Sequence, residues 1–366
     1  MPTASVLLSR QPLQPSAGTP WVRATEQALR WLGEKGYSIL TSEGIQTYEL
    51  ILYFCVKYRI NLIIVLCSTD MHHFINRYLW VKDQFDCFSC NTVFVPIICT
   101  KKEDCYKLRD QYIVENADLL LPVSIRNSGE MTRLLETCKI RGQAIDTRFQ
   151  IPYEPRLSAL KYSIKTDIIG KSIKSIENEY VVHWTRSCSY AWPGERLQTY
   201  YNAVSACRNY PRNAFFTLQN IICSSTIKAS SRHMPRDVRV VSFTGHSPSY
   251  FSSLMNWRSR YMEMSYEPYG IGIEKKAALQ FGIRPVIYQK NRNCSNPNER
   301  WLIQTYGKSS YWPDENEYRY PDDVDLSLFS TEQLICFCLN ADEAYYIEQK
   351  FGIRTLSFCE KEPSKK

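Results

Sequence analysis

The stretch "DENEYR" at residues 314–319 places two carboxylates and a guanidinium at alternate positions. Glu315, Glu317 and Arg319 are each two residues apart, so in a β-strand their side chains would lie on one face. A carboxylate fixed on such a face can stabilise positive charge that develops on a reacting group. The same spacing also suits a structural ion pair between Glu317 and Arg319, or a solvated acidic turn. Glu317 is our candidate for the key carboxylate, with Glu315 as its alternative.

Other chemically versatile side chains occur between residues 180 and 270. His183 ends the apolar run in "VVHWTR", and its ring nitrogens can donate or accept a hydrogen bond. Tyr266 and Tyr269 precede the strand-like run "GIGIE" and offer aromatic faces for a flat ligand ring. Guanidinium groups can hold a pyrophosphate at two points, and the candidates for that role are Arg186, Arg232 and Arg258.

Each of these residues also has a purely structural interpretation. His183 can be a core histidine beside Trp184, and the tyrosines can cap the core in a chain with 25 Tyr. Arg258 can pair with a nearby acidic residue such as Glu263.

A second set of polar and small residues lies in three loops of the first 150 residues, each after an expected strand. Glycine allows close approach of the backbone, while hydroxyls, free N–H groups and arginine bind phosphate oxygens. A simpler interpretation makes Ser42 and Ser128 helix caps and Glu49 a partner of the helix dipole. The nucleotide-site candidates are Ser9, Arg10, Ser42, Gly44, Thr47, Glu49, Ser124, Arg126 and Gly129.

The elements around these loops predict an α/β domain. Apolar strand-like runs such as "ASVLLSR", "NLIIVLC", "TVFVPII" and "ADLLLPVSI" alternate with amphipathic segments up to about residue 150. Nearly uninterrupted apolar strands that alternate with helices are typical of a parallel sheet covered on both faces. We therefore expect a doubly wound, Rossmann-like domain at 1–152, whose ligands bind at the carboxyl ends of the strands.

The pattern changes after a proline-containing stretch, which predicts a linker at 153–177. Strand-like runs from "EYVVHWT" to "RTLSF" then mix with helices near 195–208, 213–223, 274–280, 297–305 and 341–351. This mixture predicts an α+β domain with a mixed sheet at 178–360, followed by a polar tail at 361–366.

Composition narrows the class of protein. A chain of 366 residues with 44% hydrophobic residues supports packed cores, and a net charge of +8 permits an anionic partner. No signal peptide or membrane span is apparent, so we expect a cytoplasmic protein whose 14 Cys are reduced. Cys87 and Cys90, with His72 and His73 upstream, form a lone C-x-x-C, for which buried structural cysteines are favoured over a zinc site.

The first 150 residues resemble the SLOG superfamily. The resemblance rests on "SR" after the first strand, on "S-x-G-x-x-T-x-E" after the second, and on "SIRNSG" later. That superfamily includes DNA-processing proteins, lysine-decarboxylase-like phosphoribohydrolases and nucleotide sensors of bacterial defence systems. This chain has "SEG" where the phosphoribohydrolases have a fuller double-glycine loop. The resemblance therefore implies nucleotide binding, with hydrolysis through Glu49 as an alternative.

Residues 180–360 resemble the ADP-ribosyltransferase-like superfamily and proteins of bacterial phage-defence and abortive-infection neighbourhoods. The resemblance to the superfamily rests on a His near the first strand, an aromatic residue in the middle and a late Glu. The resemblance to the defence proteins rests on the motifs "HWTR", "IKASSR", "VVSFT", "WR", "EPYGI", "PVIY" and "E-x-E-Y-R", in that order. The resemblance implies that His183 holds the nicotinamide-side ribose, that Tyr266 or Tyr269 stacks on nicotinamide, and that Glu317 stabilises the reacting sugar. NAD would then be the substrate.

These observations predict an enzyme, an NAD-dependent ADP-ribosyltransferase or NAD glycohydrolase controlled by a nucleotide signal. Its partners would be a nucleotide or NAD-derived small molecule and a protein or nucleic-acid acceptor, and a homo-oligomer is compatible with the sequence. The alternatives are a non-enzymatic nucleotide-binding or interaction protein and a phosphoribohydrolase. We expect no tightly bound cofactor.

Overall fold

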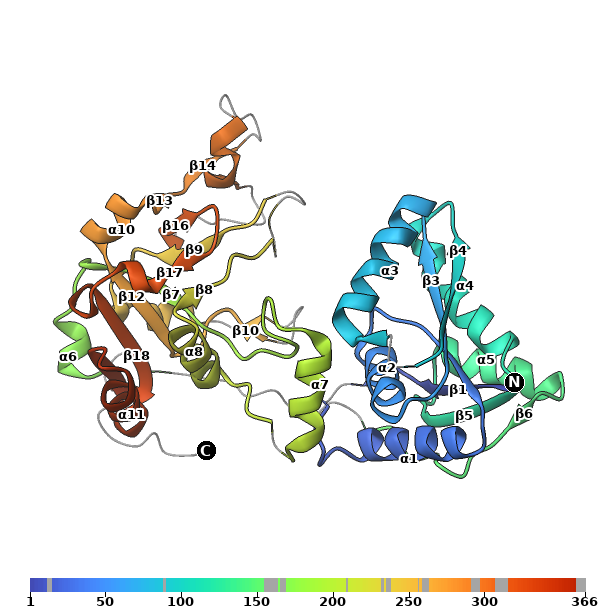
Figure 1. Cartoon of the computed structure of the whole chain (residues 1–366). Coiled ribbons are helices and arrows are strands. Elements are labelled where there is room, and N and C mark those ends of the chain that lie inside the picture. The colour runs from blue at the N-terminus through green and yellow to red at the C-terminus, as the bar shows by residue number, and fades with distance from the viewer. Residues whose placement is uncertain are drawn as a thin grey trace. The chain divides into compact units, whose positions relative to one another are not determined.

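The computed structural model describes most of the chain (Figure 1). The described residues are 1–11, 15–87, 90–154, 164, 169–208, 210–231, 234, 238–255, 257–258, 263–290, 297–306 and 315–359. They form two compact units. Unit 1 comprises residues 1–157 and 190–210, and unit 2 comprises residues 158–189 and 211–366.

Unit 1 is the expected doubly wound α/β unit. Its six strands are all parallel, in the order β4-β3-β2-β1-β5-β6. The order reverses between β1 and β5, so the topological switch point lies where these two strands end. The bounds are β1 Thr3–Leu8, α1 Pro20–Glu34, β2 Ser38–Thr41, α2 Gln46–Tyr58, β3 Leu62–Ser68, α3 Met71–Phe85, β4 Thr92–Ile98, α4 Lys102–Glu115, β5 Leu119–Ser124, α5 Glu130–Ile140, β6 Ala144–Ile145 and α7 Leu197–Ala206.

Helix α7 corrects the expected division of the chain. The sequence pattern assigns the helix near 195–208 to the C-terminal domain, whereas this helix packs within unit 1. Helix α2 explains why: every residue from Thr47 to Val56 is buried, so the helix needs apolar cover on more than one side. Helix α7 contributes buried side chains to the same core, namely Leu197, Tyr200, Tyr201 and Val204.

Unit 2 is built on a mixed sheet of seven strands, in the order β13-β16-β9-β7-β12-β18-β19. Strands β18 and β19 are parallel, and the other pairs in the sheet are antiparallel. The bounds are α6 Lys171–Lys174, β7 Tyr180–Trp184, α8 Ala214–Cys223, β8 Thr226–Ile227, β9 Val241–Thr244, α9 Phe251–Leu254, β10 Trp257–Arg258, β11 Glu263–Met264, β12 Gly270–Glu274, α10 Lys275–Phe281, β13 Arg284–Pro285, β14 Ile287–Gln289, β15 Ile303–Thr305, β16 Glu317–Tyr320, β17 Val324–Asp325, β18 Leu334–Asn340, α11 Ala341–Phe351 and β19 Thr355–Cys359.

The α/β fold class with a Rossmann-like parallel sheet and a separate mixed sheet is therefore confirmed. The expected helix near 297–305 is instead a 3-10 helix, Pro297–Leu302, followed by β15. The expected tail at 361–366 lies outside the described residues, as does most of the linker. Within the described part of the chain, the helices are too short or too polar to cross a bilayer.

Candidate functional site

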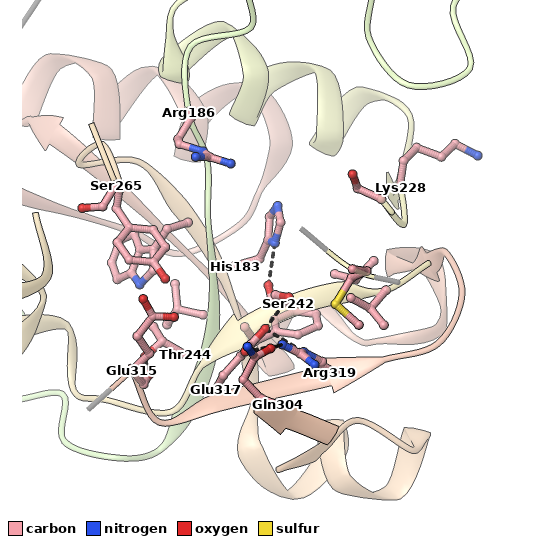
Figure 2. A pocket seen from close by; sticks show the side chains of 18 residues that line it. His183, Arg186, Lys228, Ser242, Thr244, Ser265, Gln304, Glu315, Glu317 and Arg319 are labelled. Atoms are coloured by element: carbon pink, nitrogen blue, oxygen red, sulfur yellow. Dashed lines mark hydrogen bonds and ion pairs between the residues drawn. The ribbon is translucent and has the colours of Figure 1, made fainter. Parts of the chain in front are cut away.

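A pocket of about 350 Å³ opens in unit 2 (Figure 2). This volume is at the lower end of the range for small-molecule sites, about 300 to 1,000 Å³. Strands β7, β9 and β16 and the segment before β12 supply its walls. Its titratable and aromatic lining includes His183, Arg186, Lys228, Tyr266, Glu315 and Glu317.

Three neighbouring strands bring these side chains together. Strand β7 pairs with β9 at Val182 opposite Thr244, and β9 pairs along its length with β16. In the second pairing, Glu317 lies opposite Thr244 and Arg319 opposite Ser242. Segments separated by more than a hundred residues in the sequence thereby contribute to one site.

Glu317 is held by three hydrogen bonds in the pocket. The guanidinium of Arg319 donates to both carboxylate oxygens, from Nε to Oε1 and from Nη2 to Oε2, each at 2.8 Å. The hydroxyl of Ser242 also donates to Oε1, at 2.6 Å. A carboxylate has about four lone-pair sites, so one acceptor position remains for a ligand.

Arg319 is itself fixed. Its side chain is 4% exposed and also donates to Gln304 Oε1 at 2.6 Å and to the carbonyl of Trp301 at 3.2 Å. The expected Glu317–Arg319 partnership is thus present, in the wall of the pocket. The ion pair with Arg319 is therefore compatible with a role of Glu317 as the charge-stabilising carboxylate of the pocket.

Glu315 lines the pocket from a position outside strand β16, whereas alternation predicted that it would share a strand face with Glu317. Strand β16 begins at Glu317, and Asn316 has a left-handed backbone with φ of 44°. Asparagine tolerates this conformation better than most residues. The simple rule that alternate residues share a face therefore fails before Glu317. Glu315 still lines the pocket, and its carbonyl accepts a hydrogen bond from Thr244 Oγ1 at 2.9 Å.

His183 presents a hydrogen-bond acceptor. Its Nδ1 lies 2.8 Å from the carbonyl oxygen of Ser242, so Nδ1 carries a proton and donates it. Burial and then the charge of Arg186 lower the pKa of His183, against the opposing effect of the bond to Ser242. The neutral ring keeps a lone pair on Nε2, which points away from Ser242 in Figure 2.

Two cations lie on the side of His183 away from Glu317 in Figure 2. Arg186 lines the pocket, and its backbone carbonyl accepts a hydrogen bond from Thr217 Oγ1 at 2.9 Å. Lys228, which the sequence did not single out, also lines it and donates to Asp323 at 2.8 Å. The pocket therefore combines positive charge with a separate carboxylate wall.

The two candidate tyrosines have different surroundings. Tyr266 lines the pocket. Tyr269 is 3% exposed, and its hydroxyl lies 3.1 Å from both carboxylate oxygens of Glu343 on α11. Tyr269 is therefore a core residue outside the pocket lining, which corrects its candidacy as a ligand-stacking ring. Arg232 and the side chain of Arg258 lie outside the described part of the chain, although the backbone of Arg258 pairs with Glu263.

In unit 1, two of the three candidate loops meet at the switch point. The amide of Ser9 donates to the carbonyl of Ser124 at 3.0 Å, and the amide of Arg126 donates to Ser9 Oγ at 3.0 Å. The guanidinium of Arg126 lies over the ring of Tyr153, whose hydroxyl donates to the carbonyl of Arg10. Arg10 and Arg126 are both exposed. Gly129, with φ of 137°, precedes α5 in the same loop.

Two polar side chains of the loop after β2, Ser42 and Glu43, are engaged inside unit 1. Ser42 is buried and donates to the carbonyl of Val65 at 2.6 Å, so it does not cap a helix. Glu43 pairs with Arg77. Gly44 has φ of 86°, which glycine adopts readily, and Thr47 is buried in the first turn of α2.

Glu49 is closed off by tyrosines of the 190–210 segment. Its side chain is buried, and the hydroxyl of Tyr201 donates to its Oε2 at 2.9 Å. Burial raises the pKa of Glu49, while hydrogen bonds with Tyr190 and Tyr201 lower it in part. Glu49 thus lies in the first turn of α2, the position of the simpler interpretation as a partner of the helix dipole, and it is buried away from solvent.

Of the two cysteines in the C-x-x-C stretch, Cys87 is buried in the core of unit 1 and Cys90 is half-buried against it. Burial raises the pKa of the Cys87 thiol to about 12 and that of Cys90 above its ordinary value. His72 and His73 are exposed on α3, where His73 contacts Asp70. The described residues include no group of three His, Cys, Asp or Glu arranged to hold a metal.

Some pocket residues had weak or no signals in the sequence. Ser242 and Thr244 alternate with apolar residues in "VVSFT", a period that places both on one face. Gln304 and Lys228 carry no such signal, because their positions depend on the packing of segments distant in sequence. Alternation gives the strand faces of Ser242 and Glu317, but the hydrogen bond between them also depends on the pairing of β9 with β16, which no local pattern specifies.

Comparisons with known proteins give partial similarity in fold. No protein-family model and no curated protein matches the chain. Over 39% of the chain, in its N-terminal part, it is similar to DNA processing protein A of Streptococcus pneumoniae, with 14% identity and a TM-score of 0.30. DNA processing protein A of Helicobacter pylori, whose structure concerns single-stranded DNA binding, matches with 8% identity and a TM-score of 0.29.

The Moco carrier protein of Chlamydomonas rheinhardtii matches the same share of this chain with 10% identity and a TM-score of 0.25. The matches cover 49% and 63% of the two DNA processing proteins and 73% of the carrier protein. At these identities and TM-scores they do not assign the chain to a family.

Proposed function

We propose that unit 2 binds NAD in its pocket and breaks the bond between nicotinamide and ribose. ADP-ribose then passes to water or to an acceptor molecule. The observation that carries the proposal is the convergence of His183, Tyr266 and Glu317 on one pocket, with Arg186 beside them. These residues come from three separate stretches of sequence, so their convergence was not implied by proximity along the chain.

The pocket supplies groups suited to each part of this reaction. The bond between ribose C1′ and the ring nitrogen of nicotinamide breaks, and the nitrogen keeps the bonding electron pair. Neutral nicotinamide leaves, and the sugar becomes oxocarbenium-like. The carboxylate of Glu317 stabilises the positive sugar and accepts from a ribose hydroxyl through its remaining lone pair. A water or acceptor oxygen then attacks C1′, forms the new C–O bond and releases its proton to solvent.

The other side chains bind and orient the substrate. The Nε2 lone pair of neutral His183 accepts a hydrogen bond from a second ribose hydroxyl. The ring of Tyr266 packs against nicotinamide. Arg186 and Lys228 attract the pyrophosphate oxygens.

For unit 1 we propose nucleotide binding at the switch point between β1 and β5. Its support is the meeting of the loops that carry Ser9, Arg10, Ser124, Arg126 and Gly129, at the end of the sheet where doubly wound folds bind ligands. Hydrolysis through Glu49 is not part of this proposal, because Glu49 is buried against Tyr201. In this view the chain couples a nucleotide signal to NAD consumption, in the bacterial defence role that its sequence resemblance implies.

The experiment is to incubate the protein with NAD and quantify NAD, nicotinamide and ADP-ribose, with and without added nucleotides. We expect Glu317→Gln to lower the rate by on the order of 10² to 10³, as loss of a charge-stabilising group does in other enzymes. Glu348→Gln, an exposed carboxylate on α11, is the matched control and should keep the wild-type rate.

An unchanged rate in Glu317→Gln would remove Glu317 from the catalytic role. Absence of NAD binding to the wild-type chain by calorimetry would favour the non-enzymatic alternative. Release of free base from nucleoside monophosphates would instead identify phosphoribohydrolase activity in unit 1.

A further inference from the structure

Glu267 is a buried carboxylate that contacts the rim of the pocket without lining it. It follows Tyr266 directly in the chain and is 6% exposed. Its oxygens accept two hydrogen bonds from one residue: the amide of Ser187 donates to Oε1 at 2.6 Å, and the Ser187 hydroxyl donates to Oε2 at 3.0 Å. Charge-assisted hydrogen bonds of this kind are the stronger ones in proteins.

Ser187 follows Arg186, so this contact fixes the segment that carries the arginine. The neighbouring residues are held as well: the amide of Thr185 donates to the carbonyl of Tyr269, and the amide of Cys188 donates to the carbonyl of Arg212, both at 2.8 Å. These bonds use backbone atoms, and so does the bond from Thr217 to the carbonyl of Arg186. The backbone under Arg186 is therefore set independently of its side chain.

The contact also joins two walls of the pocket. Glu267 is covalently next to Tyr266, and Ser187 is covalently next to Arg186, while Tyr266 and Arg186 both line the pocket. The two hydrogen bonds thereby fix the separation between an aromatic face and a positive charge. A ligand that uses both needs that separation to be constant.

We infer that Glu267 is a positioning residue that sets the distance between Arg186 and Tyr266, and so selects ligands with an anionic group at a fixed span from a flat ring. This inference rests on the proposed function for the identity of the ligand, NAD. It adds a residue that touches neither the ring nor the phosphates. Glutamine at this position keeps the size of the side chain but loses the charge and can no longer accept from both donors of Ser187 through two oxygens.

The first test uses the protein alone. Trypsin cleaves after Arg186, at the bond to Ser187, and cleavage of a folded chain requires the local backbone to open. We expect Glu267→Gln to accelerate cleavage at this bond, measured by mass spectrometry relative to the other tryptic sites. That ratio separates local loosening from global destabilisation.

Asp325→Asn is the matched control for this test. Asp325 accepts from the amide and the hydroxyl of one serine, Ser327, at 2.9 and 2.6 Å, and neither residue is part of the pocket lining or of the segment around Arg186. It should leave relative cleavage at Arg186 unchanged. Equal relative cleavage in Glu267→Gln and the wild type would overturn the inference, whatever the ligand.

The second test measures NAD affinity by calorimetry. We expect Glu267→Gln to weaken binding roughly tenfold, because the separation between Arg186 and Tyr266 is no longer held constant for the ligand. It should have no further effect in an Arg186→Ala background, because Glu267 acts through Arg186; additive losses would overturn the inference. Faster cleavage together with no NAD binding to the wild type would remove the proposed function and leave the positioning role supported.

Discussion

Glu317 and Arg319, two residues apart on β16, are joined by two hydrogen bonds of 2.8 Å in the wall of the unit 2 pocket. Their side chains are 14% and 4% exposed, so solvent screens the pair weakly. Each also has a further partner, Ser242 for the carboxylate and Gln304 for the guanidinium. The pair therefore has a structural role, and it fixes the position of the Glu317 carboxylate in the wall of the pocket.

Removal of the guanidinium should destabilise unit 2. Arg319→Met leaves the Glu317 carboxylate without its main partner, and an unpaired charge at such a site costs about 3 to 5 kcal/mol. The double variant Glu317→Gln, Arg319→Met should recover a large part of that loss, because no unpaired charge remains. Urea unfolding measures both free energies. Equal losses in the single and double variants would contradict this explanation.

The lowered pKa of His183 predicts a pH-dependent stability. In the unfolded chain the imidazole takes up a proton near pH 6.5, whereas in the folded protein burial, and second Arg186, oppose protonation. The contribution of neutral His183 to the free energy of unfolding is therefore fully present above pH 6.5. It is lost as the pH falls towards the lower pKa of the folded protein. Between pH 8 and 5 the wild type should lose more unfolding free energy than His183→Asn. Parallel pH curves for the two proteins would contradict the assignment.

Glu49 predicts the opposite pH behaviour. Its raised pKa means that the ionised form is disfavoured in the fold, so stability falls as pH rises through the folded pKa. Glu49→Gln should therefore be more stable than the wild type at pH 7, and the difference should shrink towards pH 4. Thermal unfolding at several pH values measures this. A Gln variant that is less stable at pH 7 would show that the ionised carboxylate is needed for the fold.

The two tyrosines should separate ligand binding from stability. Tyr266→Ala removes a ring in the pocket and should weaken NAD binding, since loss of an aromatic stacking partner costs about 1 to 3 kcal/mol. Tyr269→Phe removes the hydroxyl that meets Glu343, so it should lower the unfolding free energy by about 1.5 to 3 kcal/mol and leave affinity unchanged. Calorimetry measures the NAD affinity of both variants, and urea unfolding measures their free energies of unfolding. A weaker affinity in Tyr269→Phe would place that ring in the ligand site after all.

The sequence was informative where local patterns determine structure. Uninterrupted apolar runs identified the parallel strands of unit 1, and the helix expected at 341–351 is α11 with the same bounds. Alternation in "ENEYR" also gave the Glu317–Arg319 pair correctly. Glu315 lines the same pocket from outside the strand, because the left-handed backbone of Asn316 precedes the first residue of β16.

Long-range packing was harder to predict. The spacing of apolar residues and the composition of α7 predict a helix, but they do not specify which of the two cores the helix joins. The apolar character of α2 on every side was a usable signal that this helix needs an additional partner. Tyr266 and Tyr269 could not be separated, since their different surroundings depend on Glu343 of α11, 74 residues beyond Tyr269.

The assignment of residues 190–210 to unit 1 bears on the order in which the chain is synthesised. A ribosome completes the six strands of the parallel sheet and then β7 of unit 2 before it reaches α7. Until then α2 has no cover from Tyr200, Tyr201 and their neighbours, although domains generally fold as units during synthesis. The completion of unit 1 therefore overlaps in time with the first steps of unit 2, and no single cut in the chain yields two complete units.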